Sequence, residues 1–524
     1  MTSACSSFFI AGDDTGNSEL RRDARTAMKR ATRFMRERVA YRGGYVWSYL
    51  PDLSRRWGEM EAYPTMIWMQ PPGTATVGHL YLDCYHATRD EFYYQAAMEV
   101  ADGLIAAQHP SGGWNYLHDF AGEDSARRWY DTIGSNGWRL EEFHHYYGNT
   151  TFDDAGTSEA SQFLLRLYAV RRSSRLRAPV ERAINLVLQS QYENGGWPQR
   201  FPRVEGEAEY IRYITFNDAV SDESIKFLLM AYHTLGDERA LAAIRRAMEV
   251  FPATQQPAPQ AGWSLQHHHE TLAPMGARTY EPLSLATHTT AGNIAQMMDF
   301  YEWTGERRFI ERIPEALAWL QSVRLRDDQV RVQGRHYPTF IEIGTNRARI
   351  NHRRGSNVVS GAYYWDYNPD RPITHYSQWR AIDADALRAR YERLAATQPD
   401  LARSPLTRGN FRLPRFFTTD SIEVSDMTSN VGAGAVQRPT PERARDLISS
   451  LNAEGYWSTP LTATSQPYVG PGAVTPTPGD FAQTLVGDQF DTSPYVTSTP
   501  VTGISTGAFI QNMSSLLLMV DSGD

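Results

Sequence analysis

The sequence predicts an all-α protein: an (α/α)6-7 toroid of helical hairpins with a few short β-strands over its mouth. An internal repeat is the first sign, since segments 151–168 and 215–232 align without a gap and share nine of eighteen positions. Apolar residues in the repeats recur at i, i+3, i+4 and i+7, as in amphipathic helices. One predicted helix is left over at each end of the chain, which allows the last hairpin to close on the first.

Each unit is predicted to hold two helices joined by a short link and ended by a Gly-Trp turn. After a first helix at 18–39 and a turn with Gly43 and Gly44, paired helices are expected within 74–108, 157–191, 221–251 and 289–322. Links such as Gly-Asp and Thr-Gly-Glu are typical helix terminators. A further second helix at 441–457 and a further first helix at 505–520 complete the ring. Four units carry a matching tyrosine: Tyr85, Tyr168, Tyr232 and Tyr301.

The whole chain, 1–524, is predicted to form this single toroid domain, with two stretches that break the pattern. Residues 325–368 alternate like short strands and carry seven arginines, so we expect a basic insert at the active cleft. Residues 457–504 are rich in Thr, Pro and Gly and are expected to form a long surface loop.

Composition excludes several classes of function. A net charge of −8 and a pI near 6.0 argue against a nucleic-acid groove, although a local cationic cleft can still bind an acidic polymer. Lys29 and Lys226 are the only lysines, which disfavours a lysine base, whereas arginine suits carboxylate binding. Two cysteines, Cys5 and Cys84, make neither a disulfide framework nor a zinc-cysteine site.

Targeting signals are weak in the sequence. No apolar run reaches membrane-spanning length, so no membrane partner is expected. Residues 1–18 lack the charged-then-apolar pattern of a signal peptide. We nevertheless expect a periplasmic or secreted protein, and the sequence indicates no oligomeric state.

The Gly-Gly-Trp turns at Trp114 and Trp197 allow two interpretations. The glycines permit a positive φ, and the tryptophan can pack under the helix end as a structural staple. Alternatively, the indole ring is a platform on which a sugar stacks.

The starts of the two repeated helices carry the polar residues most suited to binding. Asn217, Asp218, Asp222 and Glu223 gather at a predicted helix N-terminus, where exposed N–H groups and oxygens can hold a sugar carboxylate or a calcium ion. Asp153 and Asp154 hold the corresponding places upstream. The simpler alternative is a helix cap made by Thr215 or Asn217.

Two connectors add further candidates. In 263–285, three successive histidines, His267 to His269, cannot all face one metal, so zinc is disfavoured, and Arg278 and Tyr280 are expected to face a substrate. An exposed polar surface is the alternative. Segment 331–364 concentrates positive charge, which predicts either a cationic surface that binds an anionic polymer or a solvated basic loop. The residues concerned are Arg335, His336, Tyr337, Arg347, His352, Arg353 and Arg354.

Four ordered stretches resemble polysaccharide lyase family ten, the pectate lyases. They are QYENGGWPQRFP, YITFND, WSLQHHHETLAPMGARTYEPLSL and YPTFIEIGTNRARI, which together span roughly 190–350. The resemblance implies an (α/α) toroid that cleaves a uronic-acid polymer by β-elimination, with calcium as the cofactor or with none required. The substrate would be glucuronan, alginate (polymannuronate) or pectate.

The chain departs from that family at three places. The arginine that is the family's catalytic base falls on Thr339, an aspartate falls on His268, and an Arg-Asp-Gly sequence becomes Arg354-Gly355. The pattern then looks more like polysaccharide lyase family thirty-eight, the glucuronan and alginate lyases, which use Asn, Glu, Arg and Tyr. That resemblance places the four roles at Asn217, Glu270, Arg331 or Arg335, and Tyr337.

A mechanism follows as a hypothesis. The proton on C5 of a uronate becomes removable only when the neighbouring carboxylate is neutralised. We expect Asn217 to do this, helped by Glu270 or His268, with Asp218 as a candidate calcium ligand. Tyr337 is then the base, its pKa lowered by Arg335 and Arg278. Flanking uronates would be held by Arg347, Arg353 and Arg354.

Two other functions stay open. One is a glycoside hydrolase on the same toroid, such as an unsaturated-uronyl hydrolase, with Asp153 and Asp218 as carboxylates about 5–10 Å apart. The other is a carbohydrate-binding toroid without catalysis, which the loss of the arginine at Thr339 would allow.

Overall fold

The computed structural model describes residues 13–136, 141–354, 362–370, 372–373, 376–420, 436–461 and 501–521. Its long helices come in pairs that pack as antiparallel neighbours, namely α2 with α3, α5 with α6, and α7 with α8. The helices are α1 (Asp13–Phe34), α2 (Thr74–Thr88), α3 (Glu91–Ala107), α4 (Glu123–Thr132), α5 (Gly156–Arg171), α6 (Ser174–Ser190), α7 (Val220–Leu235), α8 (Glu238–Thr254), α9 (Thr287–Thr304), α10 (Ile313–Val323), α11 (Ala384–Ala396), α12 (Phe417–Asp420), α13 (Pro441–Ser450) and α14 (Thr506–Val520).

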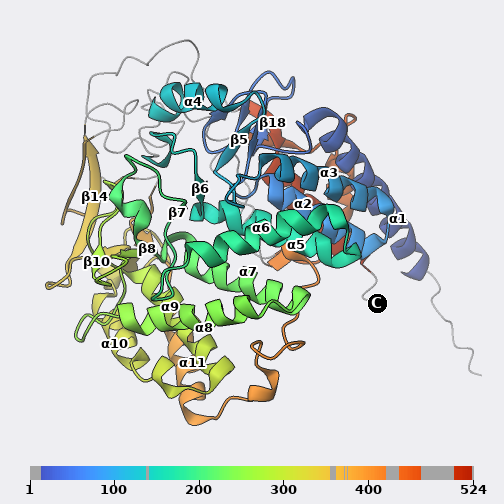
Figure 1. Ribbon diagram of the computed structural model, residues 1–524. Helices are drawn as coiled ribbons and strands as arrows, with labels where there is room; N and C mark the ends of the chain where they lie inside the picture. Colours follow the sequence, from blue (N-terminus) through green and yellow to red (C-terminus); the bar gives the residue numbers. More distant parts are fainter. Residues whose placement is uncertain are drawn as a thin grey trace, which may run out of the picture.

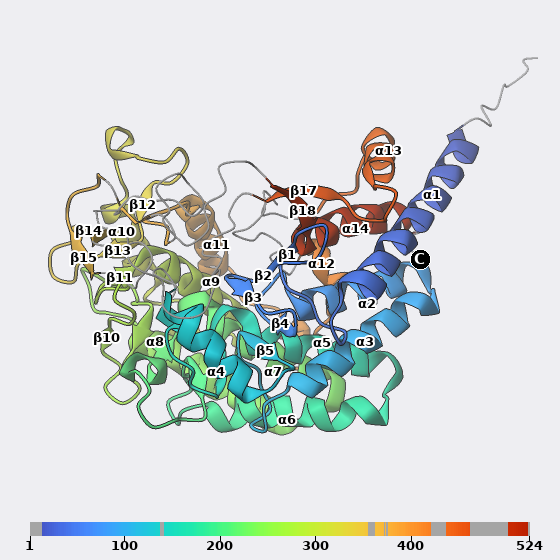
Figure 2. The same ribbon diagram turned by 90° about the horizontal axis from the view of Figure 1, so that it is seen from above.

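The two ends of the chain meet in the ring. Helix α14 packs against both α1 and α2, and strand β18 (Val501–Ser505) pairs with β1 (Ser48–Tyr49). Figures 1 and 2 show the C-terminal helix beside the N-terminal ones. From there α2, α5 and α7 pack on one another in turn. The predicted helical toroid is confirmed, including the packing of its last helix on its first. The sequence did not predict α4 or α11.

The Gly-Trp turns are structural staples. The indole Nε1 of Trp114, Trp197, Trp263 and Trp457 donates to a carbonyl at the end of the preceding helix, at 2.8–2.9 Å. Trp114 and Trp197 are completely buried. A buried ring offers no face to a sugar, so their predicted role in substrate binding is wrong. These indoles instead satisfy carbonyls that a helix end leaves without partners.

The first glycine of the Gly-Gly-Trp turns at Trp114 and Trp197 is required by a close backbone approach. Gly195 has φ +96°, and a Cβ there would lie 2.0 Å from the carbonyl oxygen of Arg246 in α8. Gly112 stands in the same relation to Arg182 in α6, at 2.2 Å. Each turn therefore packs directly on the next unit, which holds neighbouring hairpins in register.

Besides β1 and β18, the structure has the short strands β2 (Arg56–Trp57), β3 (Glu61–Ala62), β4 (Met66–Trp68), β5 (Leu117–Asp119), β6 (Thr150–Thr151), β7 (Arg200–Phe201), β8 (Ile214–Thr215), β9 (Gln266–His267), β10 (Pro274–Met275), β11 (Leu285–Ala286), β12 (Tyr337–Pro338), β13 (Phe340–Ile341), β14 (Ala348–Arg354), β15 (Ala362–Asp366), β16 (Trp379–Arg380) and β17 (Ser458–Leu461). They form small sheets in the orders β17-β18-β1-β2-β3, β10-β9-β8, β11-β13-β14-β15, β12-β16, β4-β5 and β6-β7. The predicted insert at 325–368 contains β12 to β15. In the predicted loop 457–504, residues 462–500 lie outside the described residues.

Two helix ends provide a stability test of this backbone. Helix α9 ends on Gly305 with φ +73°, whereas α2 ends on the exposed Arg89 with φ +57°. A Cβ at Gly305 would meet only Leu401, at 3.6 Å, so its cost is backbone strain alone. We expect Gly305→Ala to lower the free energy of unfolding by about 1–2 kcal/mol. Arg89→Gly should raise it by about 0.5–1 kcal/mol, since the gain is partly offset by backbone entropy.

Urea denaturation of the two variants and the unmodified protein measures both changes. Changes of the same sign in the two variants would contradict the explanation by left-handed strain.

Candidate active site

Two nearly identical turns lie at the starts of α5 and α7. They are residues 152–155 and 216–219, and we call them the two Asp tips. In the first tip Asp154 and Ala155 have φ of +47° and +55°, and in the second Asp218 and Ala219 have +49° and +54°. Consecutive left-handed residues other than glycine are strained, and such strain concentrates at functional sites. The tips contact each other across the mouth of the ring.

The tips bring three carboxylates together. One oxygen from each of Asp153, Asp154 and Asp218 lies within 4.8 Å of the others, so the three could hold a metal ion. Asp154 also belongs to a second such group with Glu59 and Glu142. Glu223, which the sequence placed in the same cluster, instead accepts a hydrogen bond from Gln162 along the ring interior.

The hydrogen bonds of Asp153 leave one oxygen free. Its Oδ2 accepts from the Tyr116 hydroxyl at 2.6 Å and from the Arg278 guanidinium. Its Oδ1 is buried and has no hydrogen-bond partner among the described residues. A buried carboxylate oxygen without a partner is costly, and a cation is a ligand that would satisfy it.

Crowding of like charges perturbs the ionisation of the site. Burial, Asp153 and Glu142 raise the pKa of Asp154 to about 8. The surrounding protein, with Asp154 and Asp153, also raises the pKa of Asp218 well above its usual range, although this side chain is accessible to solvent. Burial alone would raise the pKa of Asp153 as well, but Arg278 and the hydrogen bonds lower it. The cluster therefore favours a bound positive charge.

Arg278 is buried within this cluster and already forms ion pairs with protein carboxylates. It pairs with Asp153, with Glu142 at 3.6 Å and with Glu281 at 3.4 Å. The Tyr280 hydroxyl donates to Glu142 at 3.0 Å, and its ring is buried. Both predicted residues thus lie in the site, but they organise its carboxylates and do not point freely toward a substrate.

Asn217 lies beside the phenol of Tyr376, a residue that the sequence did not indicate as part of the site. The hydroxyl of Tyr376 lies 3.5 Å from Asn217 Oδ1 and donates to Glu281 Oε1 at 3.2 Å. Asn217 Nδ2 in turn lies 3.3 Å from Glu281 Oε1. Burial, with Glu281 and Asp218, raises the pKa of Tyr376, so the phenol is protonated. No motif surrounds Tyr376 in the sequence.

Tyr337 is positioned differently from the prediction. Its ring is buried on β12, and its charged neighbours are Arg324, Arg388, Asp385 and Asp383, none of which belongs to the Asp tips. Burial raises its pKa, so the predicted lowering by Arg335 and Arg278 is wrong. Arg278 is engaged elsewhere, as described above, and the exposed Arg335 donates to Ser377 Oγ at 2.9 Å.

Glu270 and His268 lie on a different turn from Asn217. The side chain of Glu270 is 77% exposed, and its ion-pair partner is His269, at 3.9 Å. His268 stacks on His269 and accepts from the backbone N–H groups of Glu270 and Thr271. No interaction links either residue to Asn217 among the described residues, so neither is placed to help it. No described histidine belongs to a group that could hold a metal.

The remaining predicted arginines are Arg331, Arg347, Arg353 and Arg354. Arg347 is exposed, with its guanidinium over the Tyr367 ring at 3.3 Å. Arg331 is also exposed. The backbones of Arg353 and Arg354 belong to β14, but their side chains lie outside the described residues. At Thr339, the hydroxyl receives a hydrogen bond from Arg380 Nε at 3.1 Å.

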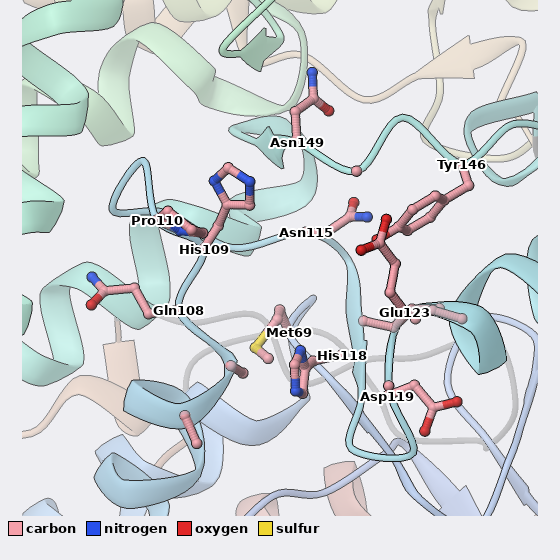
Figure 3. A pocket seen from close by; sticks show the side chains of 16 residues that line it. Met69, Gln108, His109, Pro110, Asn115, His118, Asp119, Glu123, Tyr146 and Asn149 are labelled. Carbon is pink, nitrogen blue, oxygen red and sulfur yellow. The ribbon is translucent and has the colours of Figure 1, made fainter. Parts of the chain in front are cut away.

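A pocket of about 240 Å³ is lined by Met69 and by residues within 106–126 and 146–149 (Figure 3). His109, His118 and Glu123 line it, and its Asn115 and Asn149 are held by Arg200 at 2.7 and 2.8 Å. Burial lowers the pKa of both histidines, and no Lys or Arg is among its lining residues. Its charge therefore does not suit an anionic sugar, and it contains none of the three Asp-tip carboxylates.

Comparison with known families assigns the enzyme class. Residues 128–383, which include both Asp tips, Arg278 and Tyr376, match a family model described as pectic acid lyase. The chain is a polysaccharide lyase. No curated protein matches it. Among the described residues, none of this lyase's helices is both long and apolar enough to cross a membrane.

Several solved structures are similar to this lyase. A family 10 polysaccharide lyase from Cellvibrio cellulosa is 18% identical, with a TM-score of 0.41, over 61% of this chain and 98% of that one. A mutant of that enzyme in complex with trigalacturonic acid has the same identity and coverage and a TM-score of 0.40. A cellobiose 2-epimerase from Bacillus thermoamylovorans is 10% identical, with a TM-score of 0.34, over 73% of this chain and all of that one.

Proposed function

We propose that this lyase cleaves a uronic-acid polymer by β-elimination and that Asp153, Asp154 and Asp218 hold a calcium ion at the mouth of the ring. One observation carries the proposal: three carboxylates converge within 4.8 Å, and one buried oxygen among them has no hydrogen-bond partner in the part of the chain that the structure describes. Calcium prefers carboxylate and other oxygen ligands. Asn217 Nδ2 donates to Asp218 Oδ2 at 2.6 Å and so orients that carboxylate. The residues present therefore fit this ion.

The charge of the site explains why a cation is needed for an anionic substrate. Asp153, Asp154, Asp218, Glu142 and Glu281 surround a single buried arginine, Arg278, which already pairs with three of them. These carboxylates would repel a polymer that carries one carboxylate per sugar. Bound calcium would neutralise the uronate carboxylate and so make the proton on C5 removable.

Protein groups around the tips have separate tasks in this scheme. Arg278 keeps Asp153 ionised, and Gln70 Nε2 holds Asp154 Oδ2 at 2.7 Å, which fixes both carboxylates in place. Asn217 is positioned to hydrogen-bond the uronate carboxylate. Tyr376 gives its proton to the leaving O4, because its phenol is protonated and lies beside Asn217 and Glu281. The Glu281 carboxylate accepts the proton from C5, so that the C5–H and C4–O4 bonds break as the C4=C5 double bond forms. Glu281 then returns the proton to Tyr376 through the hydrogen bond of 3.2 Å between them.

Pectate is the first polymer to test, because the matched family is described as pectic acid lyase. Glucuronan and polymannuronate have the same carboxylate on C5 and differ in stereochemistry and linkage. A periplasmic or secreted location stays a prediction, and polymeric uronates would be met there.

The test is a screen of the three polymers for the ultraviolet absorbance of an unsaturated product, with and without a chelator. We expect turnover that a chelator abolishes and calcium restores. Asp218→Asn and Asp154→Asn should each lower kcat by about 10²-fold or more, since each removes a ligand and an anionic charge. Glu270→Gln is the control, because this exposed carboxylate lies outside the cluster.

Other outcomes separate the alternatives. Full activity in chelator would disprove the calcium role. New reducing ends without absorbance would instead indicate a hydrolase, for which Asp153 and Asp218 were candidates. Binding without any product would indicate a carbohydrate-binding toroid.

A further inference from the structure

The β14–β15 hairpin lies at the edge of the molecule (Figure 1), and one of its faces carries a row of aromatic residues. Of the six large hydrophobic residues exposed in the described chain, four lie on or beside this sheet: Leu283, Ile343, Trp365 and Tyr367. Side chains alternate along a strand, so Tyr363, Trp365 and Tyr367 share a face. Exposed aromatic patches of this kind mark binding sites.

Arginines hold these rings in place. The Arg349 guanidinium lies 3.8 Å from the centroid of the Trp365 ring, and that of Arg347 lies 3.3 Å from the Tyr367 centroid. Glu342 accepts from Arg349 at 3.1 Å and from the Tyr367 hydroxyl at 2.9 Å. Both rings are thus oriented before any ligand binds, which reduces the entropy cost of binding.

Arg347 supplies a charge that is still available. Among the residues that the structure describes, Arg349 pairs with Glu342, but Arg347 has no carboxylate partner. Arginine binds carboxylates in a planar, two-pronged geometry. The described part of this face therefore combines flat apolar rings with the unpaired guanidinium of Arg347, in a protein whose net charge is −8.

The row leads back to the active site. Tyr363 lies 5.3 Å from Tyr280, centroid to centroid, and Tyr280 lies 5.7 Å from Tyr376. Asn351, directly opposite Trp365 in the sheet, donates to the Tyr280 carbonyl. Tyr363 on the hairpin is thus linked through the buried ring of Tyr280 to Tyr376 at the active site.

We propose that this face is a distal subsite on which the uronic-acid polymer continues beyond the cleft. Sugar rings of the chain stack on Trp365 and Tyr367, and Arg347 pairs with one uronate carboxylate. The identity of this ligand rests on the proposed function. The site makes the enzyme prefer long chains over short ones.

The kinetic test compares polygalacturonate with its trisaccharide, because under the proposal only a longer chain reaches this face while it occupies the active site. Trp365→Ala and Arg347→Ala should each raise KM for the polymer about fivefold to tenfold and leave kcat unchanged, because the lost contacts are equal in ground and transition states. KM for the trisaccharide should not rise. Leu401→Ala is the control, since this residue is 48% exposed on a different part of the surface. An unchanged polymer KM, or an equal rise for both substrates, would overturn the proposal.

A binding assay separates this inference from the proposed function. Native gels containing polygalacturonate, glucuronan or polymannuronate should retard the unmodified protein, and Trp365→Ala should remove most of that retardation. If no polymer is cleaved but retardation depends on Trp365, the catalytic proposal fails and the subsite stands. If Trp365→Ala is retarded as strongly as the unmodified protein in all three gels, the subsite is disproved whatever the activity.

Discussion

Tyr376→Phe should lower kcat on the cleaved polymer by about 10²- to 10⁴-fold, the usual loss when a general acid is removed. The Tyr376 hydroxyl lies beside Asn217 and Glu281, and its raised pKa keeps the proton on the phenol until the leaving O4 needs it. Phenylalanine keeps the ring contact with Phe340, at 5.7 Å, so the fold should be retained. Steady-state kinetics with circular dichroism measures both effects.

Tyr337→Phe is the matched control for this prediction. Tyr337 is the phenol that the sequence favoured, but it is buried among charged groups outside the Asp tips. We expect its kcat to stay within about threefold of the unmodified enzyme, a change that corresponds to less than 1 kcal/mol. A large loss from Tyr337→Phe together with an active Tyr376→Phe would return the proton transfer to Tyr337.

Arg278→Met should be the most destabilising single change at the site. Arg278 is buried and pairs with Asp153, Glu142 and Glu281, all of which are buried too. Removing one partner of a buried ion pair leaves uncompensated charge and costs about 3–5 kcal/mol. We expect a loss of that size in the free energy of unfolding at neutral pH, measured by urea denaturation.

Arg312→Met serves as the comparison for Arg278→Met. Arg312 pairs with Glu315 at 3.0 Å, and both side chains are at least a third exposed. An exposed pair contributes about 1 kcal/mol or less. Equal losses in the two variants would show that the carboxylates around Arg278 relax or become protonated without cost.

Sequence reasoning recovered the parts of the site that local patterns encode. The repeat located both Asp tips, because Asn217 and Asp218 occupy the same positions before α7 as Asp153 and Asp154 do before α5. It also singled out Arg278 and Tyr280, which the structure brings to those tips. It interpreted Trp114 and Trp197 as staples or sugar platforms, and burial decides for the staple.

Sequence reasoning did not locate correctly the site residues whose positions depend on contacts between distant parts of the chain. Glu270 follows the matching Trp-Ser-Leu-Gln segment closely, yet its turn carries it into solvent. Tyr376 is 159 residues from Asn217 in the chain and has no flanking motif. Trp365 and Tyr367 belong to the predicted basic insert at 325–368. Its arginines were predicted to bind the substrate, whereas its aromatic residues were not.

The sequence by itself determined the ring of hairpins, its Gly-Trp turns and the two Asp tips, because helical periodicity, positive-φ glycines and repeated residues are local properties. Only the tertiary structure decided which phenol meets Asn217 and which arginine is already neutralised by protein carboxylates. Both contacts join segments that are far apart in the chain. The burial of these side chains and the pairing of their charges exist only after the chain has folded and brought those segments together.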